Sequence, residues 1–258
     1  MCSSDLAAAA RKHIFCEKPI DLSVARAEAC VRAVREAGVA CMMGFQRRFD
    51  PTFNEVRERI ARGEIGNPEM LVVTSRDPGA PPAKFLRSSG GIFRDMLIHD
   101  FDIFRWILCG TDGDEAEWLS ATGACLVDPE IAVIPDVDSA VVTIRTRRGR
   151  LAVINASRRA AYGYDQRFEV LGSKGMLQAG NLRPHEVVQS DATGVHAEKP
   201  EAFFLQRYRE AYRLELVHFF EQLQSGGPFR TTMEDGVAVQ KLADAASEAL
   251  ASGEAVKL

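Results

Sequence analysis

A single strand–helix–strand unit opens the chain and constrains what it can fold into. Residues 13–16 form an apolar run, and residues 21–38 form an Ala- and Val-rich helix that ends at Gly38. A second apolar run, residues 39–45, follows directly. This order is the crossover unit of a parallel sheet. Because parallel strands need cover on both faces and neighbours on both sides, one unit is too little for a stable domain. The pattern predicts the last part of a larger α/β domain.

The first six residues, 1–6, suggest why the earlier part is missing. Reverse-translated with a GTG start codon, they correspond to the end of a common sequencing-adapter oligonucleotide. We expect these six residues to be adapter-derived and the natural reading frame to continue upstream. The alternative is that Ser4 or Asp5 caps the Ala-rich stretch that follows. A stop codon directly upstream would contradict the adapter interpretation.

Beyond residue 46 the pattern changes to long helices and short strands with turns between them. Helices are expected at residues 50–62, 92–108, 203–224 and 233–251. Strands are expected at residues 70–75, 139–146, 151–157, 168–172 and 176–179. Turn residues between neighbouring strands favour antiparallel hairpins. The predicted fold class is therefore an α/β remnant followed by an α+β domain whose sheet is largely antiparallel and open-faced.

Charge and cysteine content exclude several classes of protein. The 32 Lys and Arg against 36 Asp and Glu give a net charge of −4, which argues against a partner that is a nucleic acid or a membrane surface. The chain has no uncharged apolar run long enough to span a bilayer. Its six cysteines are scattered without a C-x-x-C pair, so neither a metal site nor a disulfide framework is expected. We expect a cytoplasmic protein.

The segment with the most chemical information is the predicted helix 92–108. At 100° per residue, Asp95, His99 and Asp102 fall within about 60° of one another and form one polar stripe. A carboxylate one turn from an imidazole can orient the ring and adjust its pKa, as a general base near neutral pH requires. The alternative is an ordinary i,i+4 ion pair on a partly exposed helix.

Three weaker signals accompany this stripe. Glu17-Lys18-Pro19 lies at the carboxyl end of a strand, the edge where open α/β sheets bind ligands, although a solvated turn lysine is the commoner case. The tandem pair Arg47-Arg48 could meet a substrate, could pair with carboxylates of the second domain, or could only cover surface. Tyr162 and Tyr164 could hydrogen-bond a polyol or lie half-buried at an edge.

Together these motifs resemble the Gfo/Idh/MocA oxidoreductases, the family of glucose-fructose oxidoreductase, and within it the bacterial inositol 2-dehydrogenases. The resemblance covers about residues 7–258. It rests on Lys18 in Glu-Lys-Pro and on four longer segments, which are residues 44–50, residues 75–78, Gly90-Gly91 with residues 94–100, and residues 162–167. Residues 204–212 are similar to the same group.

The resemblance implies a division of the chain into two domains. Residues 1–46 are then the carboxyl-terminal remnant of an NAD-binding Rossmann domain. Residues 47–258 are an α+β domain for substrate binding and oligomerisation, with the last helix expected to pack back on the Rossmann part. Relatives carry a glycine-rich turn before Glu-Lys-Pro, whereas this sequence contains no G-x-G-x-x-G. At about 30 residues per βαβ unit, roughly 100 residues are missing.

The implied reaction is the NAD-dependent oxidation of a secondary hydroxyl of myo-inositol to a ketone, giving 2-keto-myo-inositol. The resemblance assigns the general base to His99, its support to Asp95, and a hydrogen bond to the substrate hydroxyl to Lys18. It also implies a cis peptide bond between Lys18 and Pro19. These roles belong to the full-length parent, and we expect the 258-residue chain alone to be inactive.

The implied ligands are small molecules. The substrate-binding residues are expected to be Gln46, Arg47, Asp77, Tyr162 and Tyr164. Glu17, Lys18 and Pro19 are expected to contact NAD, and NADP stays open because the acidic residue that would bind the ribose is missing. Relatives often carry His and Asn where this sequence has Ser75 and Asp77, which is a departure from their pattern.

Two other functions stay open at this stage. In the first, an enzyme of the same family acts on scyllo-inositol or a monosaccharide. In the second, the chain is a complete, non-catalytic sugar-binding module. The open sheet face suggests a homo-oligomer, and the family resemblance suggests a tetramer.

Overall fold

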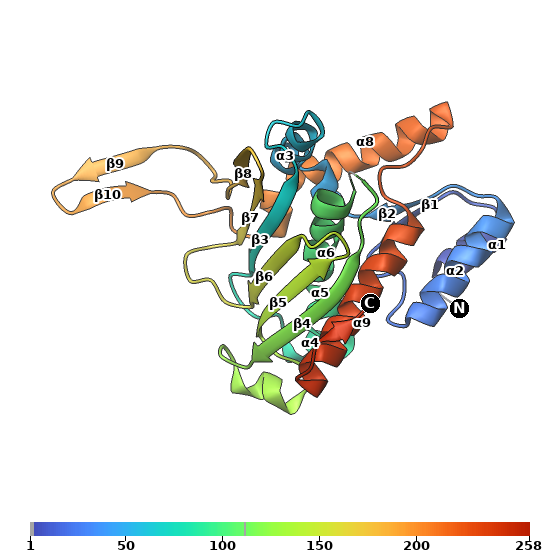
Figure 1. Ribbon diagram of the computed structural model, residues 1–258, viewed down its shortest axis with the longest axis horizontal. Coiled ribbons are helices and arrows are strands. Elements are labelled where there is room, and N and C mark those ends of the chain that lie inside the picture. Colours follow the sequence, from blue (N-terminus) through green and yellow to red (C-terminus); the bar gives the residue numbers. More distant parts are fainter. Residues whose placement is uncertain (1–2, 111) are drawn as a thin grey trace.

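The computed structural model describes residues 3–110 and 112–258 (Figure 1). Residues 1 and 2 of the six that are expected to be adapter-derived lie outside this range. The amino-terminal elements are α1 (Ser3–Ala9), β1 (Ile14–Glu17), α2 (Val24–Ala37) and β2 (Cys41–Gly44). Strands β1 and β2 are parallel, with Glu17 opposite Gly44. The Lys18–Pro19 peptide bond is cis, as predicted. The strand–helix–strand unit expected from the sequence is therefore confirmed.

The second part is built on one mixed sheet of seven strands. Their order across the sheet is β11-β4-β5-β6-β3-β7-β8, and only β3 and β6 pair in parallel. The bounds of these strands are β3 (Pro68–Arg76), β4 (Ala116–Ala124), β5 (Ser139–Thr146), β6 (Leu151–Ser157), β7 (Asp165–Gly172), β8 (Gly175–Ala179) and β11 (Val256–Lys257). A Rossmann-type remnant followed by a largely antiparallel sheet is the fold class that the sequence predicted.

Helices cover one face of this sheet. Helix α9 packs along β4 and also touches α2 and β2, so it lies between the two parts of the chain (Figure 1). The helical elements are η1 (Gln46–Phe49), α3 (Pro51–Ala61), α4 (Ala83–Ser89), α5 (Ile92–Asp95), α6 (Ile98–Phe104), η2 (Arg105–Cys109), η3 (Pro129–Val133), α7 (Phe204–Arg207), α8 (Arg209–Ser225) and α9 (Met233–Ser252). Strands β9 (Val188–Asp191) and β10 (Gly194–Ala197) form a separate hairpin that projects from the body (Figure 1).

The other face of the sheet carries a row of exposed apolar side chains. Leu151, Met70, Leu171 and Met176 stand opposite one another in register across β6, β3, β7 and β8. Each is between 37% and 48% exposed. Residues in one cross-strand row point to the same side of a sheet. The open face that the sequence predicted is therefore apolar along this row.

The expected helix 92–108 is not continuous, and this prediction is wrong. The amide of Leu97 donates to the carbonyl of Ile92, five residues back, and the helix breaks into α5, α6 and the π-helical turn η2. One extra residue in a turn rotates the residues that follow by about 100°. The break lies between Asp95 and the other two residues of the predicted stripe, so the stripe is divided there. The Asp102 carboxylate pairs with Arg48.

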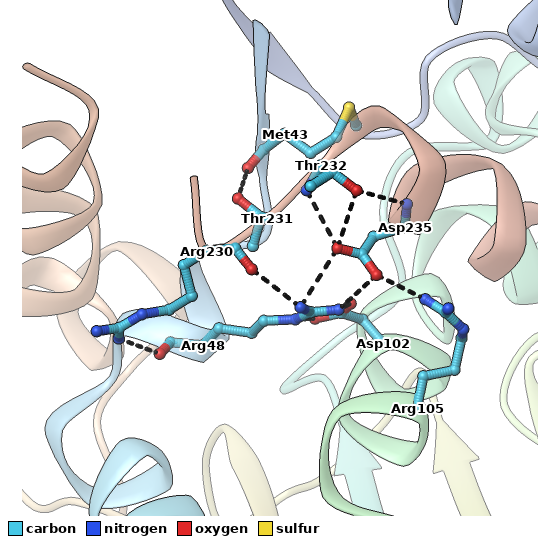
Figure 2. Close-up of polar contacts among 8 residues, drawn as sticks. All are labelled: Met43, Arg48, Asp102, Arg105, Arg230, Thr231, Thr232 and Asp235. Atoms are coloured by element: carbon cyan, nitrogen blue, oxygen red, sulfur yellow. Dashed lines mark hydrogen bonds and ion pairs between the residues drawn. The ribbon is translucent and has the colours of Figure 1, made fainter. Parts of the chain in front are cut away.

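A cluster of charged side chains links η1, α6 and the start of α9 (Figure 2). The Arg48 guanidinium donates to both carboxylate oxygens of Asp102 and to one oxygen of Asp235, and its Nη1 also donates to the Arg230 carbonyl. Arg105 donates to the second oxygen of Asp235. Arg48 is 6% exposed and Asp102 is 1% exposed. We call Arg48, Asp102, Arg105 and Asp235 the junction cluster.

Candidate active site

The ends of β1 and β2 place the first group of site residues. Because the two strands are parallel and end in register at Glu17 and Gly44, the residues that follow them leave the sheet at the same edge. Lys18 follows β1, and Gln46 and Arg47 begin η1 shortly after β2. The short turn η1 folds back at once, so both Gln46 and Arg47 are buried.

The mixed sheet places the second group in the same way. The parallel strands β3 and β6 end in register, with Arg76 opposite Ser157, and β7 begins opposite Arg76 with Asp165. Asp77, Arg158 and Tyr164 therefore come to one edge of the sheet, although about 80 residues of sequence separate the first from the other two.

Both groups line one cavity of about 960 Å³. The break between α5 and α6 adds Asp95, Met96 and His99 to its wall. Of the predicted site residues, this cavity brings together Glu17, Lys18, Gln46, Arg47, Asp77, Asp95, His99 and Tyr164. The other lining residues are Pro78, Gly79, Ala80, Pro81, Pro82, Phe85, Arg158, Phe203, Phe204, Leu205 and Tyr212.

Pro19 and Tyr162 are not among the residues that line the cavity. The Tyr162 ring is 43% exposed, and its hydroxyl donates to the Asp165 carboxylate at 2.6 Å while it accepts from Arg76 at 2.8 Å. Tyr164, in contrast, is buried and lines the cavity. The two tyrosines therefore differ in the structure: they lie before β7 on either side of Gly163, which has a positive φ of 123°.

Lys18 is held at the cavity wall by a backbone carbonyl. Its Nζ donates to the carbonyl oxygen of Asp95 at 2.7 Å. Burial lowers the pKa of the Lys18 ammonium, and the negative charge of Asp95 opposes this effect. An ammonium has three donors, and one of them is used here, so donors remain for an oxygen of a ligand in the cavity.

His99 is a neutral imidazole at neutral pH. Burial lowers its pKa well below the usual 6.5, and the positive charges of Lys18 and Arg47 lower it further. Its Nδ1 is buried without a hydrogen-bond partner, and its ring meets Phe45 edge to face. The Asp95 carboxylate instead accepts from Arg158 Nη1 at 3.1 Å. His99 can therefore accept a proton, whereas a direct hydrogen bond to Asp95 is not formed between these two described residues.

Arg47 and Asp100 form a buried ion pair behind the cavity. Arg47 Nη1 donates to an Asp100 carboxylate oxygen at 2.5 Å, and the two side chains are 5% and 0% exposed. The guanidinium also lies over the Tyr208 ring, 5.6 Å from its centroid. A buried guanidinium that is already paired keeps its charge and its direction. Arg47 can therefore present fixed donors to a polar ligand.

Asp77 supplies a carboxylate to the cavity. Burial raises its pKa to about 6, while the positive charge of Arg158 acts in the opposite direction. The carboxylate is thus mainly ionised at pH 7 and can accept hydrogen bonds from hydroxyl groups. With Lys18, Arg47 and His99, it gives the cavity both donors and acceptors for a ligand rich in hydroxyls.

Sequence reasoning missed Arg158 and Tyr212 as parts of this site. Arg158 is fully buried and directly follows β6, so its signal was a charged residue at the carboxyl end of an alternating apolar run. Tyr212 lies one turn inside α8, in a segment that carried only a family resemblance. Both depend on which strands and helices become neighbours, which spacing along the chain does not reveal.

A buried carboxyl beside the cavity is protonated at neutral pH. Glu215 on α8 is 1% exposed, its Oε1 has no hydrogen-bond partner, and burial raises its pKa to about 9, with Glu17 and Asp102 adding to the effect. Because unfolding then releases a proton between about pH 4.5 and 9, stability falls as the pH rises through this range.

We expect Glu215→Gln to increase the free energy of unfolding at pH 8 by about 1–3 kcal/mol, because the amide does not have to stay protonated. The gain should shrink towards pH 4.5, where the carboxyl is protonated in both states. Urea unfolding at pH 5 and pH 8 measures it, with Glu221→Gln on the same helix as the control. An equal effect at both pH values would contradict the prediction.

Comparison with known proteins extends these observations to the whole chain. Residues 5–45 match the profile of an oxidoreductase family with an NAD-binding Rossmann fold. Residues 53–178 match the GFO/IDH/MocA C-terminal domain. The chain is 46% identical over 251 residues to the myo-inositol 2-dehydrogenase of Thermotoga maritima, which covers 97% of this chain and 74% of that protein. The chain belongs to the GFO/IDH/MocA family of oxidoreductases.

Solved structures of this family agree with the fold. A putative myo-inositol dehydrogenase from Sinorhizobium meliloti superimposes with a TM-score of 0.95 at 44% identity, covering 98% of this chain and 76% of that one. The scyllo-inositol dehydrogenase of Lactobacillus casei, solved with NAD(H) and scyllo-inositol, superimposes with a TM-score of 0.89 at 28% identity, covering 98% and 74%. The chain thus spans about three quarters of the length of these relatives.

Polar residues of this chain stand at the strand edge where open α/β sheets bind their ligands. Glu17 and Lys18 stand at the carboxyl end of β1, where the family's Rossmann fold binds NAD, and they open into the same cavity as His99. The sequence has no G-x-G-x-x-G turn to hold the pyrophosphate. In residues 3–110 and 112–258 no group of three or more His, Cys, Asp or Glu side chains could hold a metal ion. Within the same ranges no helix is long and apolar enough to cross a membrane.

Proposed function

We propose that this chain is the substrate-binding part of an NAD-dependent inositol 2-dehydrogenase that oxidises myo-inositol to 2-keto-myo-inositol. The observation that carries the proposal is the neutral imidazole of His99 in one cavity with Lys18, at the carboxyl end of β1. The names of the relatives support the substrate class.

The proposed reaction removes a hydride and a proton from one secondary alcohol. If NAD is bound, C4 of its nicotinamide would supply the acceptor for the hydride that leaves the substrate carbon. His99 takes the hydroxyl proton, so the C–O bond becomes a carbonyl and the imidazole becomes an imidazolium. Lys18 donates a hydrogen bond to the same oxygen and stabilises the negative charge that develops on it.

The remaining hydroxyls of the ring are expected to meet the fixed polar groups of the cavity. Arg47 and Gln46 can donate, and Asp77 can accept, while the buried Tyr164 closes one side. Asp95 keeps its proposed supporting role, but through its carbonyl bond to Lys18 and its carboxylate pair with Arg158. The proposed site does not include Tyr162, because its hydroxyl is hydrogen-bonded to Arg76 and Asp165 outside the cavity.

The cofactor is proposed to be NAD. We propose that the 258-residue chain alone binds it weakly and is inactive, because the chain lacks the glycine-rich turn. The Rossmann remnant is proposed to be residues 1–46 and the substrate domain residues 47–258. The proposed place of action is the cytoplasm, on the basis of the scattered cysteines.

The experiment has two parts. Calorimetry with the 258-residue chain measures the binding of myo-inositol without and with NAD. A chimera adds to this chain the quarter of the Thermotoga maritima relative that this chain does not match. NADH formation by the chimera is then measured with myo-inositol, scyllo-inositol and glucose. The proposal expects the highest kcat/KM for myo-inositol. A preference for scyllo-inositol, for which the Lactobacillus casei relative gives a precedent, would change the substrate. Inositol binding with no turnover by the chimera would favour a non-catalytic module.

We also propose that the open sheet face joins two copies of this chain within a homo-tetramer. The apolar row of Met70, Leu151, Leu171 and Met176 supports this, because such a row on a monomer would stay in contact with water. Leu171→Lys is expected to convert the oligomer to smaller species in light scattering at micromolar concentration. Val195→Lys, on the projecting hairpin, is the control. An unchanged mass for Leu171→Lys would contradict the proposed interface.

A further inference from the structure

Arg158 is the most completely buried charged side chain at the cavity, and the reaction does not use it. It directly follows β6, and its side chain is 0% exposed. Its backbone amide donates to the Asp138 carbonyl at 2.8 Å, which fixes the start of the side chain. A buried guanidinium is destabilising unless charged partners compensate for its lost hydration. The groups that contact the Arg158 guanidinium therefore indicate its structural role.

Two carboxylates flank the Arg158 guanidinium. Nη1 donates to the Asp95 carboxylate at 3.1 Å, and Nη2 lies 3.8 Å from the Asp136 carboxylate. The other Asp136 oxygen accepts from the Ile92 amide at 2.8 Å, at the first residue of α5. Asp95 is the last residue of the same helix. Arg158 and Asp136 thus hold α5 at both ends.

The position of α5 determines where the Lys18 ammonium lies, because the Asp95 carbonyl accepts a hydrogen bond from it. A helix of four residues has too few internal hydrogen bonds to fix itself. The Arg158 and Asp136 contacts supply what the helix lacks. Any shift of Asp95 would move the donors that Lys18 offers to a ligand.

Arg158 also sets the charge balance of the cavity. The charged groups with the largest influence on Asp77 are Arg158, Asp95, Arg47 and Asp100, and Lys18 interacts with it as well. The two cations oppose the two carboxylates, and among them Arg158 has the largest effect. Arg47 is already paired with Asp100, and the Lys18 ammonium interacts with both Asp95 and Asp77, so Arg158 and Lys18 are the cations that balance these two carboxylates.

We propose that Arg158 is a positioning residue of this active site, which fixes Asp95, and through it Lys18, and places a positive charge near the Asp77 carboxylate. The functional meaning rests on the proposed dehydrogenase activity, because Lys18 and Asp77 are assigned to that reaction. The physical arrangement itself does not depend on a substrate.

The test follows the Asp77 carboxyl by carbon NMR as the pH is varied, using the 258-residue chain without ligand. In Arg158→Met, the Asp77 pKa should rise from about 6 by about one unit. Arg158→Lys, which keeps the charge, should restore the pKa to within half a unit of the parent value. Arg159→Met, at the exposed neighbouring position, should leave it unchanged. An unchanged Asp77 pKa in folded Arg158→Met overturns the proposal.

A second measurement applies if Arg158→Met does not fold. In the unsubstituted 258-residue chain, the Nη protons of Arg158 should give resolved NMR signals. These signals should shift with pH at the same midpoint as the Asp77 carboxyl. Signals that average freely, or that do not respond to the Asp77 titration, overturn the proposal. If these results hold while inositol does not bind, the proposed function fails and the positioning role stands.

Discussion

Replacing His99 with Ala is expected to lower kcat for inositol oxidation by roughly 10²–10⁴-fold, the range for loss of a general base. The reason is that the neutral imidazole can take the hydroxyl proton at pH 7. Burial and the charges of Lys18 and Arg47 hold its pKa well below 6.5. The activity is measured as NADH formation by the completed chimera, with fold checked by circular dichroism.

The pH dependence separates a base from a packing residue. Because the His99 pKa is lowered, the imidazole stays neutral down to a pH below 6.5, and the acidic limb of the kcat profile should lie below that value. His99→Asn, which keeps a polar side chain in the cavity, should lose kcat like His99→Ala. His196→Ala, on the exposed β9–β10 hairpin, should keep full activity. Retention of kcat in His99→Asn would exclude His99 as the base.

The part of the site that sequence predicts well is the part set by local order along the chain. Strand β1, helix α2 and strand β2 follow one another directly, and parallel neighbours must end at one edge. That rule alone brings Lys18 and Arg47 together. The family motifs then supplied His99 and Asp95, whose roles stay predictions.

The part that sequence does not predict is set by long-range pairing. Strands β3 and β6 are about 80 residues apart and pair in parallel within an otherwise antiparallel sheet, and this pairing brings Arg158 beside Asp77. No repeat or spacing in the sequence predicts this strand pairing. The sequence also does not predict the break after Asp95, because it depends on the Leu97 amide donating to the carbonyl of Ile92, five residues back. The break lies before both His99 and Asp102, so it divides Asp95 from the rest of the predicted stripe.

The tandem arginines confirm one of the alternatives open from sequence, since both pair with carboxylates of the second domain. Arg47 lines the cavity and pairs with Asp100, whereas Arg48 turns the other way and pairs with carboxylates of the second domain. Adjacent residues in a short helical turn point in different directions. The second role leads to a prediction about stability, because the junction cluster joins η1, the turn that follows β2, to α6 and α9 (Figure 2).

Arg48→Met is expected to lower the free energy of unfolding by about 3–5 kcal/mol, because it leaves the fully buried Asp102 carboxylate without its cation. Arg105→Met should cost only about 0–1 kcal/mol, since Arg105 is 31% exposed and Asp235 keeps Arg48.

The pH dependence of this loss identifies its cause. Burial raises the pKa of Asp102, and Arg48 opposes that effect. Without Arg48, the folded-state pKa rises further above the unfolded value, so stability falls as the pH rises between the two. The loss in Arg48→Met should therefore be larger at pH 8 than at pH 5 in urea unfolding. A loss that is the same at both pH values would mean that packing of the side chain, and not the buried charge of Asp102, accounts for the role of Arg48 at the junction.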